Sequence, residues 1–170
     1  WISPNFSATA RYVGGGFTQH NVKSMCCTAC GFVYYINPSA ATAAFIQNEK
    51  GELLVCRRAK EPAKGTLDLP GGFVDSNETG EEAIAREVQE ETGGTVTEAT
   101  YLFSLPNLYE YSGLTIPTLD MFFACRLADD RHLHANDDVA ACRFVPLDEI
   151  DPQQFGLQSI RRAVERFLGR

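Results

Sequence analysis

The chain has 170 residues, of which 44% are hydrophobic, so it can form one compact domain with a small appendage and is unlike a disordered chain. Fifteen basic and 22 acidic residues give a net charge of −7, which argues against holding long nucleic acid by charge attraction. No apolar stretch approaches the roughly 20 residues of a membrane helix, and no secretory signal opens the chain, so we expect a cytoplasmic protein without a membrane partner.

Residues 1–38 differ in character from the rest. Residues 1–25 have little periodicity and include a run of three glycines, so we expect them to be loosely ordered or short-stranded. A cluster of Cys26, Cys27 and Cys30 follows, and Asn37-Pro38 predicts a boundary. The other three cysteines are scattered in apolar contexts, which is not the pattern of a disulfide framework and indicates a reducing compartment. We therefore expect an N-terminal extension over residues 1–38 and a second domain over 39–170.

From Ala41 onward the pattern predicts a β-rich domain with two helices. Strands or short extended pieces are expected at Ala44–Gln47, Leu53–Arg57, Thr66–Leu69, Val96–Leu105, Leu119–Leu127 and Ala141–Val145. The fifth of these, LDMFFACRL, is apolar enough to be central in a sheet. Helices are expected at Glu81–Thr92, with Gly93-Gly94 as its stop, and at Ser159–Leu168. This order of elements indicates a layered α/β domain.

The first helix carries an unusual stripe of carboxylates. Viewed along the helix axis, Glu91 lies about 40° from Glu87 in one direction and Glu90 lies about 60° from Glu87 in the other. All three carboxylates therefore share one face. Such like charges repel and acids near a helix C-terminus oppose its dipole, although Arg86 should offset part of this through Glu82 and Glu90. A solvated acidic face is the ordinary explanation. The preceding Pro70-Gly71-Gly72 turn lets the backbone approach a ligand closely, so we favour divalent cations on the stripe.

This segment resembles the Nudix box, which reads glycine, five residues, Glu, seven residues, then Arg-Glu-apolar-x-Glu-Glu-x-Gly-apolar. The matching residues are Gly72, Glu78, Arg86, Glu87, Val88, Glu90, Glu91 and Gly93. Only the final apolar position departs, since Gly94 occupies it. Seven fixed letters coincide by chance at about 10⁻⁹ per start point, so the match is highly specific. The resemblance covers roughly residues 40–168.

The resemblance implies a Nudix-type α/β/α sandwich around a mixed β-sheet. It implies an enzyme that uses Mg²⁺ or Mn²⁺ to hydrolyse a nucleoside diphosphate linked to another moiety, and a homodimer is compatible with it. The implied catalytic residues are Glu87, Glu90, Glu91 and Arg86. Glu87 and Glu91 would be the main metal ligands, Glu90 would bind a further metal or act through water, and the carbonyl of Gly71 would complete a metal shell. Arg86 would orient the glutamates, and Glu78 would hold the loop.

The general base stays open at this stage. Family members use either a glutamate of the box or an acid from a later loop, so Glu90 is one candidate. Asp137 and Asp138 occupy about the right place for the second, although a simple polar turn explains them equally well. Four cations before the box, Arg57, Arg58, Lys60 and Lys64, either grip phosphate oxygens or are ordinary surface residues.

The cysteine cluster resembles the second half of the zinc ribbon that precedes the Nudix domain in NADH pyrophosphatases. Cys27-x-x-Cys30 has the form of a zinc knuckle, but a structural zinc site needs four ligands and no cysteine precedes Cys26. His20 and Cys26 are conceivable extra ligands at an unusual spacing. We therefore favour bare thiols over Zn²⁺ at Cys27 and Cys30, and treat the extension as a degenerate ribbon.

The substrate is less determined than the reaction. NADH pyrophosphatases carry Ser-Gln-Pro-Trp-Pro-Phe-Pro after the box, whereas this chain has SLPNLYEYSG at residues 104–113, without the Trp-Pro-Phe core. Phe103, Tyr109 and Tyr111 either stack on a ring of the substrate or pack in a sheet. We expect NADH, ADP-ribose or a related dinucleotide or nucleotide sugar. The alternatives are a nucleoside triphosphate-sanitising pyrophosphatase and a non-catalytic Nudix ligand-binding module.

Overall fold

The computed structural model describes residues 16–111 and 113–170, so the expectation for residues 1–15 lies outside the described part. The chain divides into two compact units, and each is described by itself. One unit comprises residues 1–38 with Leu108–Pro117, and the other comprises Ser39–Asn107 with Thr118–Arg170.

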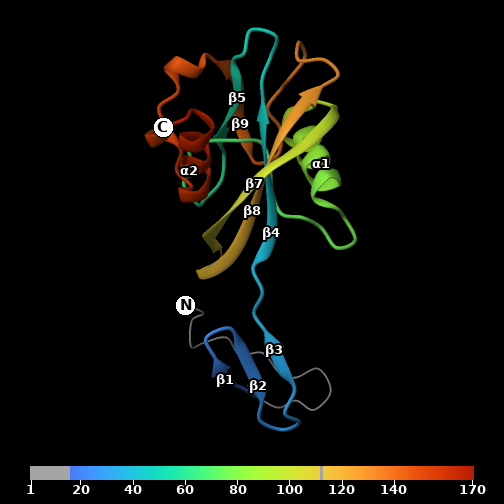
Figure 1. Cartoon of the computed structure of the whole chain (residues 1–170), viewed down its shortest axis with the longest axis vertical. Helices are drawn as coiled ribbons and strands as arrows, with labels where there is room; N and C mark the ends of the chain where they lie inside the picture. The colour runs from blue at the N-terminus through green and yellow to red at the C-terminus, as the bar shows by residue number, and fades with distance from the viewer. Residues whose placement is uncertain (1–15, 112) are drawn as a thin grey trace. The chain divides into compact units, whose positions relative to one another are not determined.

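The first unit contains a small antiparallel sheet. Its strands are β1 (Phe17–Asn21), β2 (Ser24–Cys27) and β3 (Val33–Tyr35), in the order β1-β2-β3 (Figure 1). The short-stranded alternative is therefore correct for residues 17–25. The turn between β2 and β3 is closed by the Gly31 amide, which donates to the Cys27 carbonyl at 3.0 Å while Gly31 has a left-handed φ of 72°.

The second unit is built on two three-stranded sheets with the orders β4-β8-β7 and β6-β5-β9. The β4 and β8 strands are parallel, whereas β5 is antiparallel to both β6 and β9, so the arrangement is mixed. An isolated bridge between Gln47 and Leu53 links the two sheets. The expected strands all exist, and β8 is central as expected. Their bounds are β4 Ser39–Ile46, β5 Leu53–Arg58, β6 Leu67–Asp68, β7 Val96–Tyr111, β8 Leu114–Leu127 and β9 Val139–Val145.

Two α-helices occur in the described part of the chain, and neither is long and apolar enough to cross a bilayer. Helix α1 (Gly80–Thr92) begins with a capping box, in which Thr79 accepts from the Glu82 amide at 3.2 Å and Glu82 accepts from the Thr79 amide at 2.8 Å. It ends at Gly93, whose φ of 70° provides the expected stop. Helix α2 spans Gln158–Phe167, after two short 3₁₀ turns at Leu147–Glu149 and Pro152–Gln154.

The strands between the helices are buried on both faces, and adjacent residues alternate between two cores. One core joins Phe45, Val55 and Phe122 to the apolar face of α2. The other joins Ile46, Leu54 and Phe123 to Ile84 and Val88 of α1. Figure 1 shows α1 and α2 on opposite sides of the strands, as an α/β/α sandwich requires.

A buried polar contact attaches α2 to the central strand. Asp120 of β8 is 7% exposed and accepts hydrogen bonds from Ser159 at 2.5 Å and Thr118 at 2.6 Å. Leu157 caps α2 without a side-chain hydrogen bond. Asp120 therefore places a carboxylate near the positive end of the α2 dipole, where it stabilises the helix start.

We expect Ser159→Ala to lower the free energy of unfolding by about 1–3 kcal/mol, because the buried Asp120 carboxylate would lose a donor. Urea unfolding followed by circular dichroism measures this loss. Gln158→Ala, at the exposed neighbouring position, is the control and should change stability by less than about 0.5 kcal/mol. Equal losses in the two variants would contradict the role given to the contact.

Candidate active site at the glycine turn and helix α1

The Pro70-Gly71-Gly72 turn is held against strand β4. The amides of Ala44 and Thr42 donate to the carbonyls of Pro70 and Gly72, each at 2.8 Å. A Cβ at Gly71 would lie 2.1 Å from the Thr42 carbonyl oxygen, and the φ of 153° at Gly71 also disfavours a side chain. Because neighbouring carbonyls alternate in an extended chain, the Gly71 carbonyl is directed away from β4, on the same side as its own amide.

That amide contacts Glu91, the last glutamate of the α1 stripe. The Gly71 N–H donates to Glu91 Oε2 at 2.9 Å, and Glu91 is only 8% exposed. The pKa of Glu91 is raised to about 8, chiefly by burial; the hydrogen bond from the Gly71 amide opposes this shift, and the negative charges of Asp68, Glu87 and Asp138 contribute to it. A carboxylate is thus kept in a dry site that favours its neutral form unless a cation is present.

Glu87 lies one turn earlier and packs beneath Gly72. A Cβ at Gly72 would lie 2.6 Å from the Glu87 carboxylate, so this side chain occupies the space that the glycine leaves. Burial raises the pKa of Glu87, and the hydrogen bond and charge of Arg86 oppose that shift. The glycine turn therefore brings its backbone into contact with two carboxylates of α1, one buried and one partly buried.

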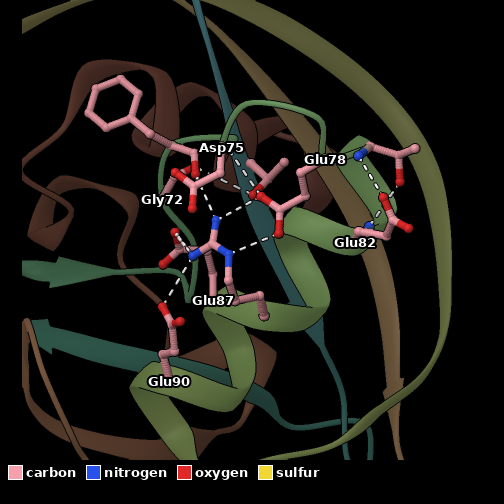
Figure 2. Close-up of polar contacts among 10 residues, drawn as sticks. Gly72, Asp75, Glu78, Glu82, Glu87 and Glu90 are labelled. Atoms are coloured by element: carbon pink, nitrogen blue, oxygen red, sulfur yellow. Dashed lines mark hydrogen bonds and ion pairs between the residues drawn. The ribbon is translucent and has the colours of Figure 1, made fainter.

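Arg86 is the cation at the centre of this cluster (Figure 2). Its guanidinium donates to both oxygens of Glu78 at 2.9 Å, to Glu87 at 2.7 Å and to Glu90 at 3.1 Å. It also donates to the Phe73 carbonyl at 3.0 Å. The hydrogen bonds that Arg86 donates to Glu78 and Glu87 raise the pKa of Arg86 despite its partial burial.

One expectation about Arg86 is wrong. Its partner toward the start of the helix is Glu78 rather than Glu82, because the Glu82 carboxylate accepts from the Thr79 amide and is used to cap α1. Figure 2 shows Glu82 at the helix start, separate from the group formed by Glu78, Glu87 and Glu90. Glu78 also accepts from the Asp75 amide at 3.0 Å, so it links the loop to the helix.

Glu90 is placed differently from its two neighbours on the stripe. Its side chain is 48% exposed and is turned toward Arg86. In the described ranges no group of three or more His, Cys, Asp or Glu residues is arranged as a metal site, at the stripe or at the cysteines. Arg86 neutralises part of the negative charge of the stripe through its hydrogen bonds to Glu87 and Glu90.

The donors present at the turn nevertheless match a hard divalent cation. The buried carboxylate of Glu91 and the partly buried carboxylate of Glu87 both contact the glycine turn. Together with the Gly71 carbonyl they offer the kind of oxygen donors that Mg²⁺ and Mn²⁺ prefer. Glu90 can join them if it leaves Arg86. The residues that the sequence singled out are therefore brought together, and their assignment as ligands stays a prediction.

Asp68 lies beside the site, although nothing in the spacing of the acidic helix points to it. It is 8% exposed, its negative charge raises the pKa of Glu91, and it is directly opposite Cys56 in the β5–β6 register. Burial raises the pKa of Asp68, and the ion pair with Arg58, at 2.5 Å, opposes the shift. The sequence signal for it is an acid inside the apolar run TLDLP.

The later acids also reach this end of the helix. The backbone amide of Asn136 donates to the Glu91 carbonyl at 2.9 Å and that of His134 to the Thr92 carbonyl at 3.0 Å, so the loop before β9 is docked on the end of α1. In that loop Asp137 and Asp138 both form ion pairs with Lys60. Of the two, Asp138 is the one whose charge raises the pKa of Glu91.

The aromatic residues after the box lie on strand β7, since that strand continues to Tyr111 instead of ending at Leu105. Phe103 packs against Phe45 and Phe122, with ring centroids 6.5 and 5.2 Å apart, and lies beneath the Arg166 guanidinium. The sheet-packing alternative is therefore correct for Phe103.

All six cysteines are free thiols, in agreement with the absence of a disulfide framework.

Comparisons with known proteins agree on a family. A family model described as a NUDIX domain matches residues 37–167. A MutT-like protein of Streptomyces ambofaciens is 32% identical over 123 residues, which cover 72% of this chain and 73% of the relative. A crystal structure of a NUDIX hydrolase from Nitrosomonas europaea superposes with a TM-score of 0.76 over 95% of this chain and 90% of its own, at 24% identity. The expected Nudix-type fold is confirmed.

Two further relatives match over less of their own length. An ADP-ribose pyrophosphatase of Methanocaldococcus jannaschii is 44% identical over 59 residues, which cover 35% of this chain and 34% of that protein. An NAD-capped RNA hydrolase NudC of Stutzerimonas stutzeri is 27% identical over 150 residues, which cover 87% of this chain and 51% of that protein. This chain therefore spans about half or less of these two relatives.

The pKa of Glu91 leads to a pH-dependent prediction. Because it is about 8 in the fold and 4.5 ordinarily, the stabilisation from Glu91 is present below pH 4.5 and is lost as the pH rises through 8. The melting temperature of metal-free protein should therefore fall from about pH 5 to about pH 8.5. A divalent cation binds the ionised carboxylate, so the increase in melting temperature that Mg²⁺ causes should be larger at about pH 8.5 than at about pH 6.

Differential scanning fluorimetry with EDTA or with Mg²⁺ measures both effects. Glu91→Gln, which cannot ionise, should flatten the pH dependence and reduce the Mg²⁺-induced rise. A rise of the same size at both pH values in the unaltered protein would contradict the prediction.

Proposed function

This chain belongs to the NUDIX hydrolase family, and from that membership we propose that it hydrolyses the diphosphate bond of an ADP-ribosyl compound with the help of Mg²⁺ or Mn²⁺. The observation that carries the proposal is the placement of two carboxylates, the buried Glu91 and the partly buried Glu87, against the Gly71-Gly72 backbone. A solvated acidic face would leave these side chains in water. Their burial next to backbone oxygen donors is what a cation-binding site for a diphosphate requires.

The substrate class rests on what two relatives share. ADP-ribose and NAD both contain adenosine joined to a second ribose through a diphosphate, and these compounds appear in the names of the ADP-ribose pyrophosphatase and the NAD-capped RNA hydrolase. The net charge of −7 argues against a long RNA contact. A capped end presents only a dinucleotide, however, so a capped RNA belongs among the substrates to be tested.

We propose roles for the residues of the site as follows. Glu87 and Glu91, with the Gly71 carbonyl, would hold the cation, and Glu90 would be a further ligand. A bound Mg²⁺ or Mn²⁺ supplies charge neutralisation for the diphosphate and a water of lowered pKa. Arg86 keeps Glu87 oriented, and Glu78 keeps Arg86 in place through two hydrogen bonds.

We assign the general base to Asp138 rather than to Glu90. Glu90 is proposed as a further metal ligand, whereas Asp138 lies in the loop docked on the end of α1, where its negative charge raises the pKa of Glu91. In the reaction the water oxygen bonds to one phosphorus, its proton passes to Asp138, and the bridging P–O bond breaks. The bond electrons leave with the second phosphate.

Several finer expectations stay predictions: a homodimer, a cytoplasmic location, and a degenerate zinc ribbon that favours bare thiols at Cys27 and Cys30. The Gly31-to-Cys27 hydrogen bond shapes a turn compatible with a knuckle. Metal analysis of the purified protein tests the zinc alternative.

Glu91→Gln and Glu87→Gln should each lower kcat/KM by about 100-fold or more, because each removes a charged ligand from the site. The assay uses ADP-ribose, NADH, an NAD-capped RNA, a nucleotide sugar and a nucleoside triphosphate with Mg²⁺, and chromatography identifies the products. Cleavage of the diphosphate in ADP-ribose or NADH, ahead of triphosphates, is the expected result.

Glu81→Gln is the matched control, since Glu81 is an exposed glutamate of the same helix. It should keep near-normal activity, and unchanged melting temperatures would show that all three variants fold. Near-normal activity of both site variants would overturn the assignment. No cleavage of any compound by the unaltered protein would favour a ligand-binding module.

A further inference from the structure

Two loops meet at the C-terminal end of α1. The loop before β9 is docked on that end through the Asn136 and His134 amides, and the Ala59 amide donates to the Asp138 carbonyl at 2.8 Å. Ala59 opens the β5–β6 loop, which closes on itself because Gly65 donates to the Arg58 carbonyl at 2.9 Å. The backbone around Asp138 is therefore held by α1 and by the β5–β6 loop, whereas its side chain is not part of these backbone contacts.

The side chain of Asp138 pairs with Lys60. The Lys60 ammonium forms an ion pair with Asp138 and lies 3.7 Å from an Asp137 oxygen. The side chain of Lys60 is 62% exposed and that of Asp138 is 50% exposed. Such an exposed pair is weakly held, and lysine is a compact charge on a flexible stem, so little opposes an exchange of partners.

The neighbouring arginines are not free to exchange in this way. Arg58 is half-buried, donates to the Pro62 carbonyl at 2.7 Å and pairs with the buried Asp68. Arg57 donates to the Gly65 carbonyl at 2.5 Å. These two cations shape the β5–β6 loop, whereas the Lys60 ammonium contacts carboxylates that face water.

We infer that Lys60 is a positioning residue that releases Asp138 when a substrate phosphate arrives. A diphosphate carries more negative charge than one carboxylate, so Lys60 moves from Asp138 to a phosphate oxygen. The released Asp138 then accepts the proton of the attacking water. The inference rests on the proposed function. The exchange of partners makes Asp138 available as a base only when substrate is bound.

The competing explanation is that the Lys60–Asp138 ion pair only links the two loops and never breaks. The two explanations predict different effects of Lys60 and Asp138 variants on phosphate binding. If Lys60 exchanges partners, Asp138 competes with phosphate for it, so removing the Asp138 charge strengthens phosphate binding. Removing Lys60 weakens binding. If the pair only staples two loops, both changes lower the melting temperature and neither alters binding in a specific direction.

The experiment measures binding of α,β-methylene ADP, a diphosphate that resists cleavage, by calorimetry at fixed Mg²⁺. Lys60→Ala should weaken binding by about 10-fold and Asp138→Asn should strengthen it by about 3-fold. In the double variant the Asp138→Asn gain should disappear, because no lysine remains to be released. Lys60→Arg should restore most of the affinity. Lys50→Ala, an exposed lysine in the β4–β5 turn, should bind like the unaltered protein.

Kinetics supply the second readout. Lys60→Ala should raise KM while kcat stays within about 3-fold, and Asp138→Asn should lower kcat by about 100-fold. Unchanged binding in both single variants, or a gain from Asp138→Asn that survives without Lys60, would overturn the exchange. If no variant cleaves any diphosphate but the opposite binding effects are observed, the proposed function fails and the exchange stands.

Discussion

The hydrogen bond from the Gly71 amide to Glu91 is the contact on which the site depends. It requires that the turn lie flat on β4, which only glycine allows at Gly71, since a Cβ there would collide with the Thr42 carbonyl. It also requires that α1 end at Gly93 with Glu91 on its inner face. One short contact thus couples a strand, a turn and a helix, and it buries a carboxylate at a point where a backbone carbonyl is also directed.

The acids around this contact are paired with three cations that differ in how exposed they are. Arg86 is fixed by Glu78 and by a backbone carbonyl, so it orients Glu87 and holds Glu90. Arg58 is fixed by the loop that it closes and balances the buried Asp68. Lys60 is exposed and pairs with exposed acids. Buried pairs are costly to break and therefore set geometry, whereas an exposed pair can respond to a ligand.

Chemistry and specificity are carried by different parts of the chain. The proposed reaction centre lies on the glycine turn, α1 and the loop before β9. Residues 104–111, where NADH pyrophosphatases have a distinguishing motif, continue strand β7, and Phe103 beside them is used in the core. The relatives are named for different compounds, so a substrate class is proposed from the diphosphate that these compounds have in common.

The sequence by itself determined the local features. The stop at Gly93 and the common face of Glu87, Glu90 and Glu91 follow from spacing, because helix geometry repeats within a few residues, and the apolar run of β8 indicated its central position. Only the tertiary structure decided which of these carboxylates is buried, that Arg86 pairs with Glu78 rather than Glu82, and that Asp68 lies near Glu91. The same holds for Lys60 and Asp138, which are 78 residues apart in number and meet as an ion pair. Such contacts depend on how strands and loops distant in the chain are brought together, and no local period encodes that.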